Sequence, residues 1–362
     1  MIVKGDSLPC RRCSELPRTN FKGCQVYLYV PTKHHIEPIE ELLESLKKDY
    51  NFHEDYFLFK VEDFMTFVKK IEGLGLNHLD QKDIKVLPID SKNKLSFDGL
   101  KNLRSLEAWI ALCNGGVILD ILKSENIKIL FQPIIDVKNK KIYGYEALCR
   151  GYTSNGSIIS PDILFKKAKE MDLIFHLDRL CREQAIQQAY EAGIKEKLFI
   201  NFLPTAIYDP RKCLQTTDAA VKKTDLYPSQ ITFEVVETEY IEDFNHLNYI
   251  LNYYKEKGYS TALDDMGSGY ATEDSLISLS PDYMKIDMDI IRGIHLDSKK
   301  QGQLKKYLKI IKEKNTRALA EGIESKEELD YVMNQGVALV QGYYFAKPSE
   351  TLVALDLEEL FL

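Results

Sequence analysis

STALDDMGSGY, residues 260–270, is the segment around which the rest of the chain is organised. A short apolar run typical of a strand ends there in Asp264 and Asp265, and Gly-Ser-Gly follows one residue later. Two neighbouring carboxylates repel each other and have raised pKa values unless a cation lies between them. The glycines permit backbone conformations with positive φ, so the chain can turn sharply beside that charge. Taken alone, the segment favours an ordinary surface turn; the remainder of the chain favours a metal-binding pair of acids.

Strand and helix patterns alternate over residues 119–353. The strand candidates are Ile127–Asp136, Lys141–Leu148, Lys197–Phe202, Gln230–Val236, Ser260–Asp264, Tyr283–Asp287, Arg317–Glu321 and Ala338–Gln341. The helical stretches between them include Asp162–Met171, Asp178–Ala192, Phe244–Lys257, Lys300–Lys314 and Lys326–Asn334. About eight strands with helical crossovers predict an α/β fold, a TIM-like (β/α)8 barrel, followed by a C-terminal tail over residues 354–362.

Residues 1–118 predict a separate small α/β domain. Its strand candidates are Cys24–Val30, Tyr56–Val61 and Ile84–Ile89, and helical patterns cover Ile36–Tyr50, Phe64–Ile71 and Leu100–Lys123. A hinge is expected near Asn114-Gly115-Gly116, and Trp109, the single tryptophan, is expected to pack at the junction with the barrel. The domain carries no recognisable ligand signature, and a sensory or regulatory role is the working hypothesis.

Composition narrows the class of protein. The chain has 362 residues, of which 44% are hydrophobic and 28% charged, as in ordinary globular proteins. A formal net charge of −7 argues against binding to a DNA or RNA polymer through charge alone. No apolar run reaches the roughly 18 residues of a membrane span, and no secretory signal is evident. The seven cysteines are an odd number and are expected to be reduced thiols in the cytoplasm.

Residues able to bind a metal or a phosphate stand at the ends of most predicted strands. They are Glu146, Asn201, Glu234, Asp264, Asp265, Lys285, Glu321 and Gln341. In a barrel these strand ends meet at one face, where active sites are built. Five acids at one face need cations, and oxygen donors without Cys or His favour Mg²⁺ or Mn²⁺. Two such ions about 3.5–4 Å apart are a common solution for displacement at phosphorus.

The arrangement resembles the EAL-domain family of cyclic di-GMP phosphodiesterases. The resemblance covers roughly residues 125–350 and rests on several motifs in order. These are FQPI at 131–134, EALCR at 146–150, INFLP at 200–204, EVVE at 234–237, DDMGSGY at 264–270, KID at 285–287, EGIE at 321–324 and QGYYFAKP at 341–348. Any one of these motifs is weak evidence, but their joint occurrence in order is specific.

The resemblance implies roles for individual residues. The implied metal ligands are Glu146, Asn201, Glu234, Asp264, Asp265 and Glu321, holding two Mg²⁺ or Mn²⁺ ions. The implied catalytic groups are Glu146, Lys285, Glu321 and Gln341, with Lys285 orienting water or stabilising charge on phosphate. The implied substrate contacts are Gln132, Leu148, Arg150 and Asp287. Glu237 would hold the loop after Asp265 in position, and Arg150 would grip a phosphate, a task that suits its fork geometry.

Some positions depart from the family pattern. Gly151 and then Tyr152 follow the motif arginine, Met266 replaces the usual Phe, and Ala271-Thr272 replaces a Ser-Ser pair. These changes put substrate stacking and loop regulation in doubt, but none removes an implied ligand. Single residues also have plainer explanations: Asp287 suits a cap, Arg150 an ion pair, and Lys285 a surface lysine with a buried stem.

The resemblance implies a metal-dependent phosphodiesterase that hydrolyses cyclic di-GMP to linear pGpG. One alternative is a catalytically silent receptor for cyclic di-GMP, and another is a scaffold with affinity for neither metal nor nucleotide. The family likeness also suggests a homodimer through the helix after the 266–282 loop.

A second group of possible metal ligands lies near the N-terminus. Cys10-x-x-Cys13, Cys24 and the adjacent pair His34-His35 are compatible with a zinc or redox site, although their spacing is not that of a standard zinc finger. Ordinary thiols are the alternative. Cys113, Cys149, Cys181 and Cys213 lie in apolar or helical contexts and are expected to fill small buried spaces.

Overall fold

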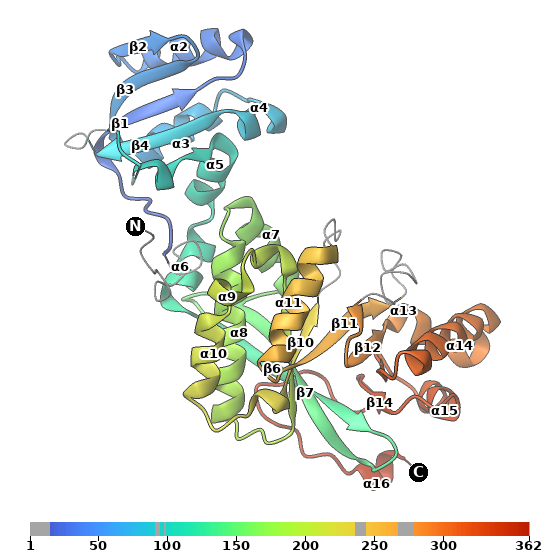
Figure 1. Cartoon of the computed structure of the whole chain (residues 1–362). Helices are drawn as coiled ribbons and strands as arrows, with labels where there is room; N and C mark the ends of the chain where they lie inside the picture. Colours follow the sequence, from blue (N-terminus) through green and yellow to red (C-terminus); the bar gives the residue numbers. More distant parts are fainter. Residues whose placement is uncertain (1–14, 91–94, 98, 236–243, 267–278, 362) are drawn as a thin grey trace. The chain divides into compact units, whose positions relative to one another are not determined.

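The computed structural model describes residues 15–90, 95–97, 99–235, 244–266 and 279–361. The described chain forms two compact units (Figure 1). The N-terminal unit comprises residues 15–126 together with 153–177, and the barrel unit comprises 127–152 and 178–361. Among the described helices, none is both long and apolar enough to cross a lipid bilayer.

The N-terminal unit is built on a five-stranded antiparallel sheet in the order β2-β3-β1-β4-β5. Its strands are β1 (Lys22–Tyr29), β2 (Tyr50–His53), β3 (Tyr56–Asp63), β4 (Lys85–Asp90) and β5 (Arg104–Ser105). Its helices are η1 (Lys33–His35), α2 (Ile36–Ser45), α3 (Phe64–Glu72), α4 (His78–Asp83), η2 (Gly99–Asn102), α5 (Leu106–Asn114), α6 (Gly116–Ser124) and α7 (Pro161–Glu170). The short β8 spans Ile158–Ile159.

The sequence patterns predicted β1, β3 and β4 but missed β2, β5 and α4, which are short. Helix α5 ends at Asn114 and α6 begins at Gly116, so the chain breaks between two helices at the expected place. Both helices belong to the N-terminal unit, and a hinge between domains at these residues stays a prediction. The expectation for Trp109 is wrong. Its side chain is fully buried in the core of the N-terminal unit, against the rings of Phe21 and Phe64, and its indole N–H donates to the carbonyl of Val86 at 3.1 Å.

The barrel unit confirms the predicted eight-stranded barrel. Its strands are β6 (Ile127–Asp136), β7 (Lys141–Tyr152), β9 (Lys197–Phe202), β10 (Ile231–Val235), β11 (Ser260–Met266), β12 (Tyr283–Ile286), β13 (Arg317–Ala320) and β14 (Leu339–Val340). They run in the order β6-β14-β13-β12-β11-β10-β9-β7, and a β6–β7 pairing closes the ring.

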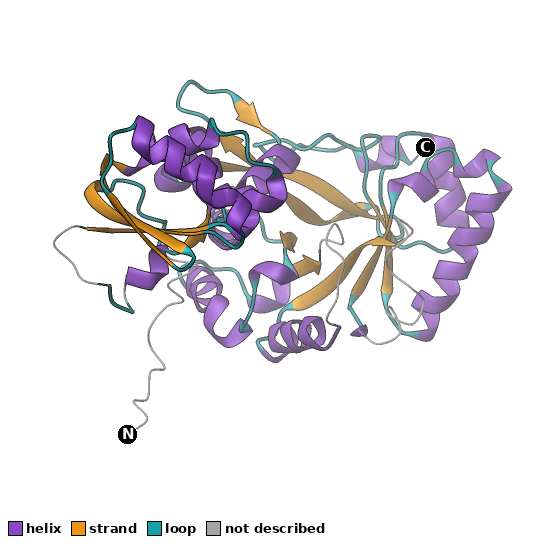
Figure 2. Cartoon of the chain, turned by 90° about the horizontal axis from the view of Figure 1, so that it is seen from above, coloured by secondary structure: helices purple, strands orange, loops and turns teal. Residues whose placement is uncertain are grey.

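Helices lie outside these strands, as Figure 2 shows in purple against orange. They are α8 (Ile174–Glu191), η3 (Pro204–Ala206), α9 (Pro210–Cys213), α10 (Gln215–Lys222), η4 (Pro228–Gln230), α11 (Phe244–Glu256), α13 (Met288–Ile291), η5 (Ile294–Leu296), α14 (Ser298–Glu313), α15 (Lys326–Asn334) and α16 (Leu357–Leu360). The last of these, α16, accepts a hydrogen bond from the Tyr344 hydroxyl at the carbonyl of Leu360, 2.8 Å away.

One strand departs from a regular (β/α)8 barrel. β6 is antiparallel to both of its neighbours, β7 and β14, whereas the other neighbouring strands of the ring run parallel. The cause is the connection between β6 and β7, which covers only residues 137–140. Parallel neighbours need a crossover of about a dozen residues, whereas antiparallel strands need only a short turn.

An apolar layer fills the inside of the barrel. Six strands each contribute one almost fully buried side chain to it: Ile134, Phe199, Ala262, Tyr283, Leu319 and Leu339. Side chains of a strand alternate between faces, so the residue two positions further along each strand also points into the barrel. The position of the apolar layer therefore determines which residues of the next layer along the barrel axis point inward.

Candidate active site

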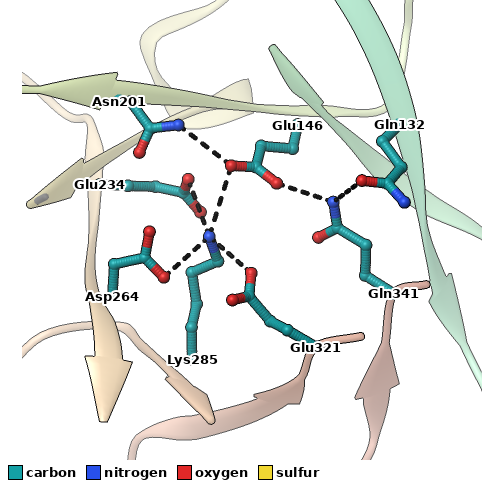
Figure 3. Close-up of polar contacts among 8 residues, drawn as sticks. All are labelled: Gln132, Glu146, Asn201, Glu234, Asp264, Lys285, Glu321 and Gln341. Atoms are coloured by element: carbon teal, nitrogen blue, oxygen red, sulfur yellow. Dashed lines mark hydrogen bonds and ion pairs between the residues drawn. The ribbon is translucent and has the colours of Figure 1, made fainter. Parts of the chain in front are cut away.

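The next level of the barrel interior is polar. On five of the parallel strands, the residue two positions after the apolar-layer residue is polar. These residues are Asn201, Asp264, Lys285, Glu321 and Gln341. On the antiparallel strand β6 the equivalent residue is two positions earlier, Gln132. Glu146 on β7 and Glu234 on β10 complete the group, which Figure 3 shows joined by hydrogen bonds and ion pairs. Strand periodicity thus brings residues separated by up to 209 positions into one cluster.

Lys285 stands at the centre of this cluster (Figure 3). Its side chain is 1% exposed, and its ammonium lies within ion-pair distance of four carboxylates. The Nζ-to-oxygen distances are 2.7 Å to Glu321, 3.0 Å to Asp264, 3.2 Å to Glu234 and 3.5 Å to Glu146. One positive charge therefore faces four acidic groups, so additional positive charge is favourable here.

Glu146 is held by amide donors as well as by Lys285. Asn201 donates from Nδ2 to Glu146 Oε1 at 3.0 Å, and Gln341 donates from Nε2 to Glu146 Oε2 at 2.7 Å. The same Gln341 nitrogen lies 3.0 Å from Gln132 Oε1, and Gln132 donates in turn to the carbonyl of Ala346 at 3.2 Å. Both oxygens of Glu146 are thus oriented by groups on, or directly after, other strands of the barrel.

The electrostatics follow from burial and crowding. Burial raises the pKa of Glu234 well above its usual range, and the charges of Glu146 and Asp264 add to this against the opposing effect of Lys285. Burial also raises the pKa of Glu321. Burial opposes ionisation of Glu146, but Lys285 and the amide donors outweigh it and lower its pKa. The pKa of Lys285 is raised because the surrounding carboxylates outweigh burial.

Three buried oxygens of the cluster have no hydrogen-bond partner among the described residues. They are Oδ1 of Asn201, Oε1 of Glu234 and Oε1 of Gln341. A buried polar atom without a partner is unfavourable, so such atoms favour the binding of a water molecule or an ion. Together with the acidic groups they form a set of oxygen donors, which suits a hard divalent cation such as Mg²⁺ or Mn²⁺. The residues present therefore fit a metal centre.

The structure brings together all five of the implied ligands whose side chains it describes. Asp264 lies at an irregularity of β11, between Leu263 and Met266, where the register with β12 shifts. The backbone of Asp265 belongs to β11, but its side chain lies outside the described residues, as do Glu237, Ala271 and Thr272.

The implied substrate contacts occupy varied positions. Gln132 belongs to the cluster, whereas Leu148 and Arg150 are half-buried further along β7. The Arg150 guanidinium donates to the carbonyl of Cys149 at 2.7 Å. Asp287 caps the short helix α13 by accepting from the backbone N–H of Asp289, and its contact with a substrate stays a prediction.

A buried ion pair that the sequence analysis missed supports the segment after β9. Asp178 and Arg182, on α8, each have a side chain that is 2% exposed and lie 2.9 Å apart. Asp178 Oδ1 accepts from the backbone N–H of Leu203 at 2.9 Å, and Arg182 also donates to Thr217. Leu203 stands two residues after Asn201. The i, i+4 spacing of an acid and a base on a predicted helix was the available signal.

The segments after β13 and β14 are tied together in a similar way. The Ile323 N–H donates to the carbonyl of Gln341 at 3.0 Å, and the Gln341 N–H donates to that of Ala320 at 2.9 Å. Buried Glu328 accepts from the backbone of Glu324 at 2.9 Å and of Gly293 at 2.8 Å. These contacts position Glu321 and Gln341 at the mouth of the barrel.

Comparison with models of known protein families identifies the family to which this barrel belongs. The model of the EAL domain matches residues 117–348. The chain belongs to the EAL domain family. The eight residues of Figure 3 all lie within the matched range, so the cluster belongs to the EAL domain.

Curated relatives and solved structures are also similar to this chain. The probable cyclic di-GMP phosphodiesterase PdeG of Escherichia coli (strain K12) is 30% identical over 239 residues, covering 64% of this chain and 46% of PdeG. A standalone versatile EAL protein from Vibrio cholerae O395, solved with cyclic di-GMP bound, is 40% identical with a TM-score of 0.59, covering 65% of this chain and 97% of that one.

A third likeness reaches beyond the EAL barrel. Klebsiella pneumoniae BlrP1, solved as a manganese and cyclic di-GMP complex, covers 92% of this chain and 98% of that one, at 20% identity and a TM-score of 0.58. At that identity the likeness concerns the fold alone. The chain spans about half the length, or less, of the curated relatives that it matches.

Proposed function

We propose that this chain is a phosphodiesterase that hydrolyses cyclic di-GMP to linear pGpG with two divalent cations, Mg²⁺ or Mn²⁺. The observation that carries the proposal is the convergence of four acidic groups around Lys285, with three buried oxygens that lack a partner among the described residues. The names of relatives such as PdeG and the bound nucleotide of the V. cholerae protein support the choice of substrate.

The proposed metal ligands are Glu146, Asn201, Glu234, Asp264, Asp265 and Glu321. When bound, two such cations activate a water molecule and stabilise the charge that develops on the phosphate. Asn201 and Gln341 orient the Glu146 carboxylate through the hydrogen bonds described above. Lys285 neutralises part of the acidic cluster and donates hydrogen bonds toward the reacting phosphate or its water.

Substrate contacts are assigned to residues around the mouth of the barrel. Arg150, Leu148, Gln132 and Asp287 are proposed to contact the nucleotide, with the Arg150 guanidinium pairing with a phosphate. Glu237 is proposed to hold the loop that follows Asp265. We also propose that the chain acts as a homodimer through its EAL barrel, and that the domain over residues 1–118 regulates it.

The test is product formation by wild type and a matched pair of variants. Glu146→Gln keeps the shape of the side chain but removes its charge, and is expected to reduce pGpG formation in Mn²⁺ to the level seen with chelator. Glu313→Gln, at an exposed position on α14, is the control and should retain wild-type turnover. Product is separated by chromatography, and circular dichroism checks that each variant is folded.

The outcomes separate the proposal from its alternative. Metal-dependent pGpG from wild type and Glu313→Gln, but not from Glu146→Gln, supports the enzyme. Saturable binding of cyclic di-GMP by wild type without any product would instead make the chain a receptor. Turnover by Glu146→Gln at the wild-type rate would rule out the two-metal site.

A further inference from the structure

Two adjacent histidines and an aspartate meet at the surface of the N-terminal unit. His34 and His35 belong to η1, between β1 and α2, whereas Asp80 lies in α4. One potential ligand atom from each of the three residues lies within 4.8 Å of the others. Asp80 Oδ1 is 3.0 Å from Nε2 of His35 and 3.8 Å from Nε2 of His34. Residues 45 positions apart thus direct three ligand atoms to one place.

A single hydroxyl orients both imidazole rings. Thr32 Oγ1 lies 2.9 Å from Nδ1 of His34 and 2.8 Å from Nδ1 of His35. When both rings donate their Nδ1–H to this oxygen, the two Nε2 atoms are unprotonated and carry the lone pairs that a metal needs. Histidine ligands in proteins usually have their other ring nitrogen held by an oxygen in this way, which fixes the tautomer.

The buried member of the pair has an unused nitrogen. His35 is 2% exposed, and its Nε2 has no hydrogen-bond partner among the described residues. The Asp80 carboxylate oxygen lies 3.0 Å from that nitrogen, a distance that suits an ion pair when the imidazole is protonated and also suits two ligands of one cation. Burial of an imidazole nitrogen without a partner is unfavourable, so the geometry calls for a further atom between the rings and the carboxylate.

We propose that His34, His35 and Asp80 bind a divalent transition-metal ion of the zinc class. Two imidazole nitrogens and one carboxylate oxygen are ligands that Zn²⁺ accepts at about 2.0–2.2 Å, which places neighbouring tetrahedral ligand atoms roughly 3.3 Å apart. The observed separations of 3.0 and 3.8 Å from Asp80 bracket that value. The His34 side chain is 67% exposed, so solvent water can complete the coordination.

This site is independent of the proposed phosphodiesterase activity and differs from the barrel in chemistry. The barrel cluster offers oxygen donors, which suit hard ions, whereas imidazole nitrogen favours borderline ions such as Zn²⁺. It also differs from the cysteine grouping considered from the sequence. Cys24 is fully buried in β1 and is absent from the three-residue group, while Cys10 and Cys13 lie outside the described residues.

The test is calorimetric titration of the full chain with Zn²⁺ in excess Mg²⁺, which occupies the oxygen-donor sites. His34→Gln changes an exposed side chain in a short turn and is expected to remove one zinc equivalent. Thr32→Val removes the shared hydroxyl and is expected to weaken that equivalent by about 10–100-fold. His53→Gln is the control, because His53 is exposed and outside the group, and it should bind zinc as wild type does.

Circular dichroism of each variant ensures that lost binding reflects a lost ligand rather than unfolding. Asp80→Asn provides a second ligand variant that keeps the side-chain shape, and it should also lose the equivalent. The proposal is overturned if wild type takes up no zinc under these conditions. It is equally overturned if His34→Gln and Asp80→Asn bind zinc with wild-type stoichiometry and affinity, since the three residues would then form only an ion pair.

Discussion

At the scale of single residues, Lys285 is the side chain that offsets the repulsion among the acidic groups of the cluster. Its ammonium is the nearest cation to four acidic groups of the described cluster, all of which have side chains no more than 18% exposed. A buried ion pair contributes little net stability compared with apolar residues, but removing one partner leaves uncompensated charge. Lys285 and the proposed cations would therefore have overlapping electrostatic roles in this cluster.

Lys285→Met tests that overlap. In chelator, the variant is expected to lose about 3–5 kcal/mol of the free energy of unfolding, because four acidic groups lose their cation. Saturating Mn²⁺ should restore much of this loss, since the metal supplies the missing charge. Urea unfolding with and without Mn²⁺ measures both values. An equal loss in the two conditions would show that the metal and Lys285 do not act on the same carboxylates.

At the scale of elements, α8 and the segments after the strands position the site from outside. The Asp178–Arg182 pair stands on α8 and holds the backbone of Leu203 after β9. On the same helix, Arg179 and Glu183 form a second i, i+4 pair with side chains 19% and 22% exposed. The Asp178–Arg182 pair is almost fully buried, whereas the Arg179–Glu183 pair is partly exposed to solvent.

Arg182→Met is expected to destabilise the barrel by about 3–5 kcal/mol, because Asp178 keeps a buried charge without its guanidinium. Arg179→Met should cost no more than about 1 kcal/mol, as for partly solvated pairs. Adding Asp178→Asn to Arg182→Met should recover part of the loss, because the uncompensated charge is removed. Denaturant midpoints compare the variants, and similar costs at the two arginines would contradict the assignment.

The close approach of the segments after β13 and β14 depends on Gly342. A Cβ at this position would overlap the backbone of Ile323. Gly342→Ala is therefore expected to cost about 1–3 kcal/mol by forcing that backbone aside, and to lower turnover because Gln341 moves. Gly302→Ala is the matched control: open space surrounds this position within α14, and the change should stabilise by about 0.5–1 kcal/mol. Thermal unfolding measures both, and no loss at Gly342 would contradict the packing argument.

At the scale of the whole molecule, the two proposed sites lie in different units of the chain. The described members of the acidic cluster lie within residues 127–152 and 178–361. The N-terminal unit contains the His34, His35 and Asp80 group and also includes residues 153–177. There α7 contacts both α5 and α6, so this segment within the family match belongs to the core of the preceding unit.

Deleting residues 1–118 is expected to leave a chain that still forms pGpG, at an altered rate, because the barrel supplies the cluster. Its thermal midpoint should fall, since α7 loses the cover of α5. Chromatography and a thermal scan of the same sample provide the two readouts. A folded but inactive truncated chain would mean that the N-terminal unit is required for catalysis.

The sequence by itself determined the barrel and its polar layer. Strand patterning predicts the barrel strands at the right places. The strand ends identify seven residues of the cluster: Glu146, Asn201, Glu234, Asp264, Lys285, Glu321 and Gln341. Such residues are predictable because period-two alternation and parallel strands bring strand ends to one face. The short β2, β5 and α4 were missed because a few residues carry too little periodic signal.

Only the tertiary structure decided how distant residues meet. The antiparallel direction of β6, the place of Trp109 among Phe21 and Phe64, and the support of Leu203 by Asp178 depend on packing between segments far apart in the sequence. The same holds for Asp80, whose position beside His34 and His35 no local pattern indicates. Local patterns fix which way a side chain points along its own element, whereas the fold fixes what that side chain meets.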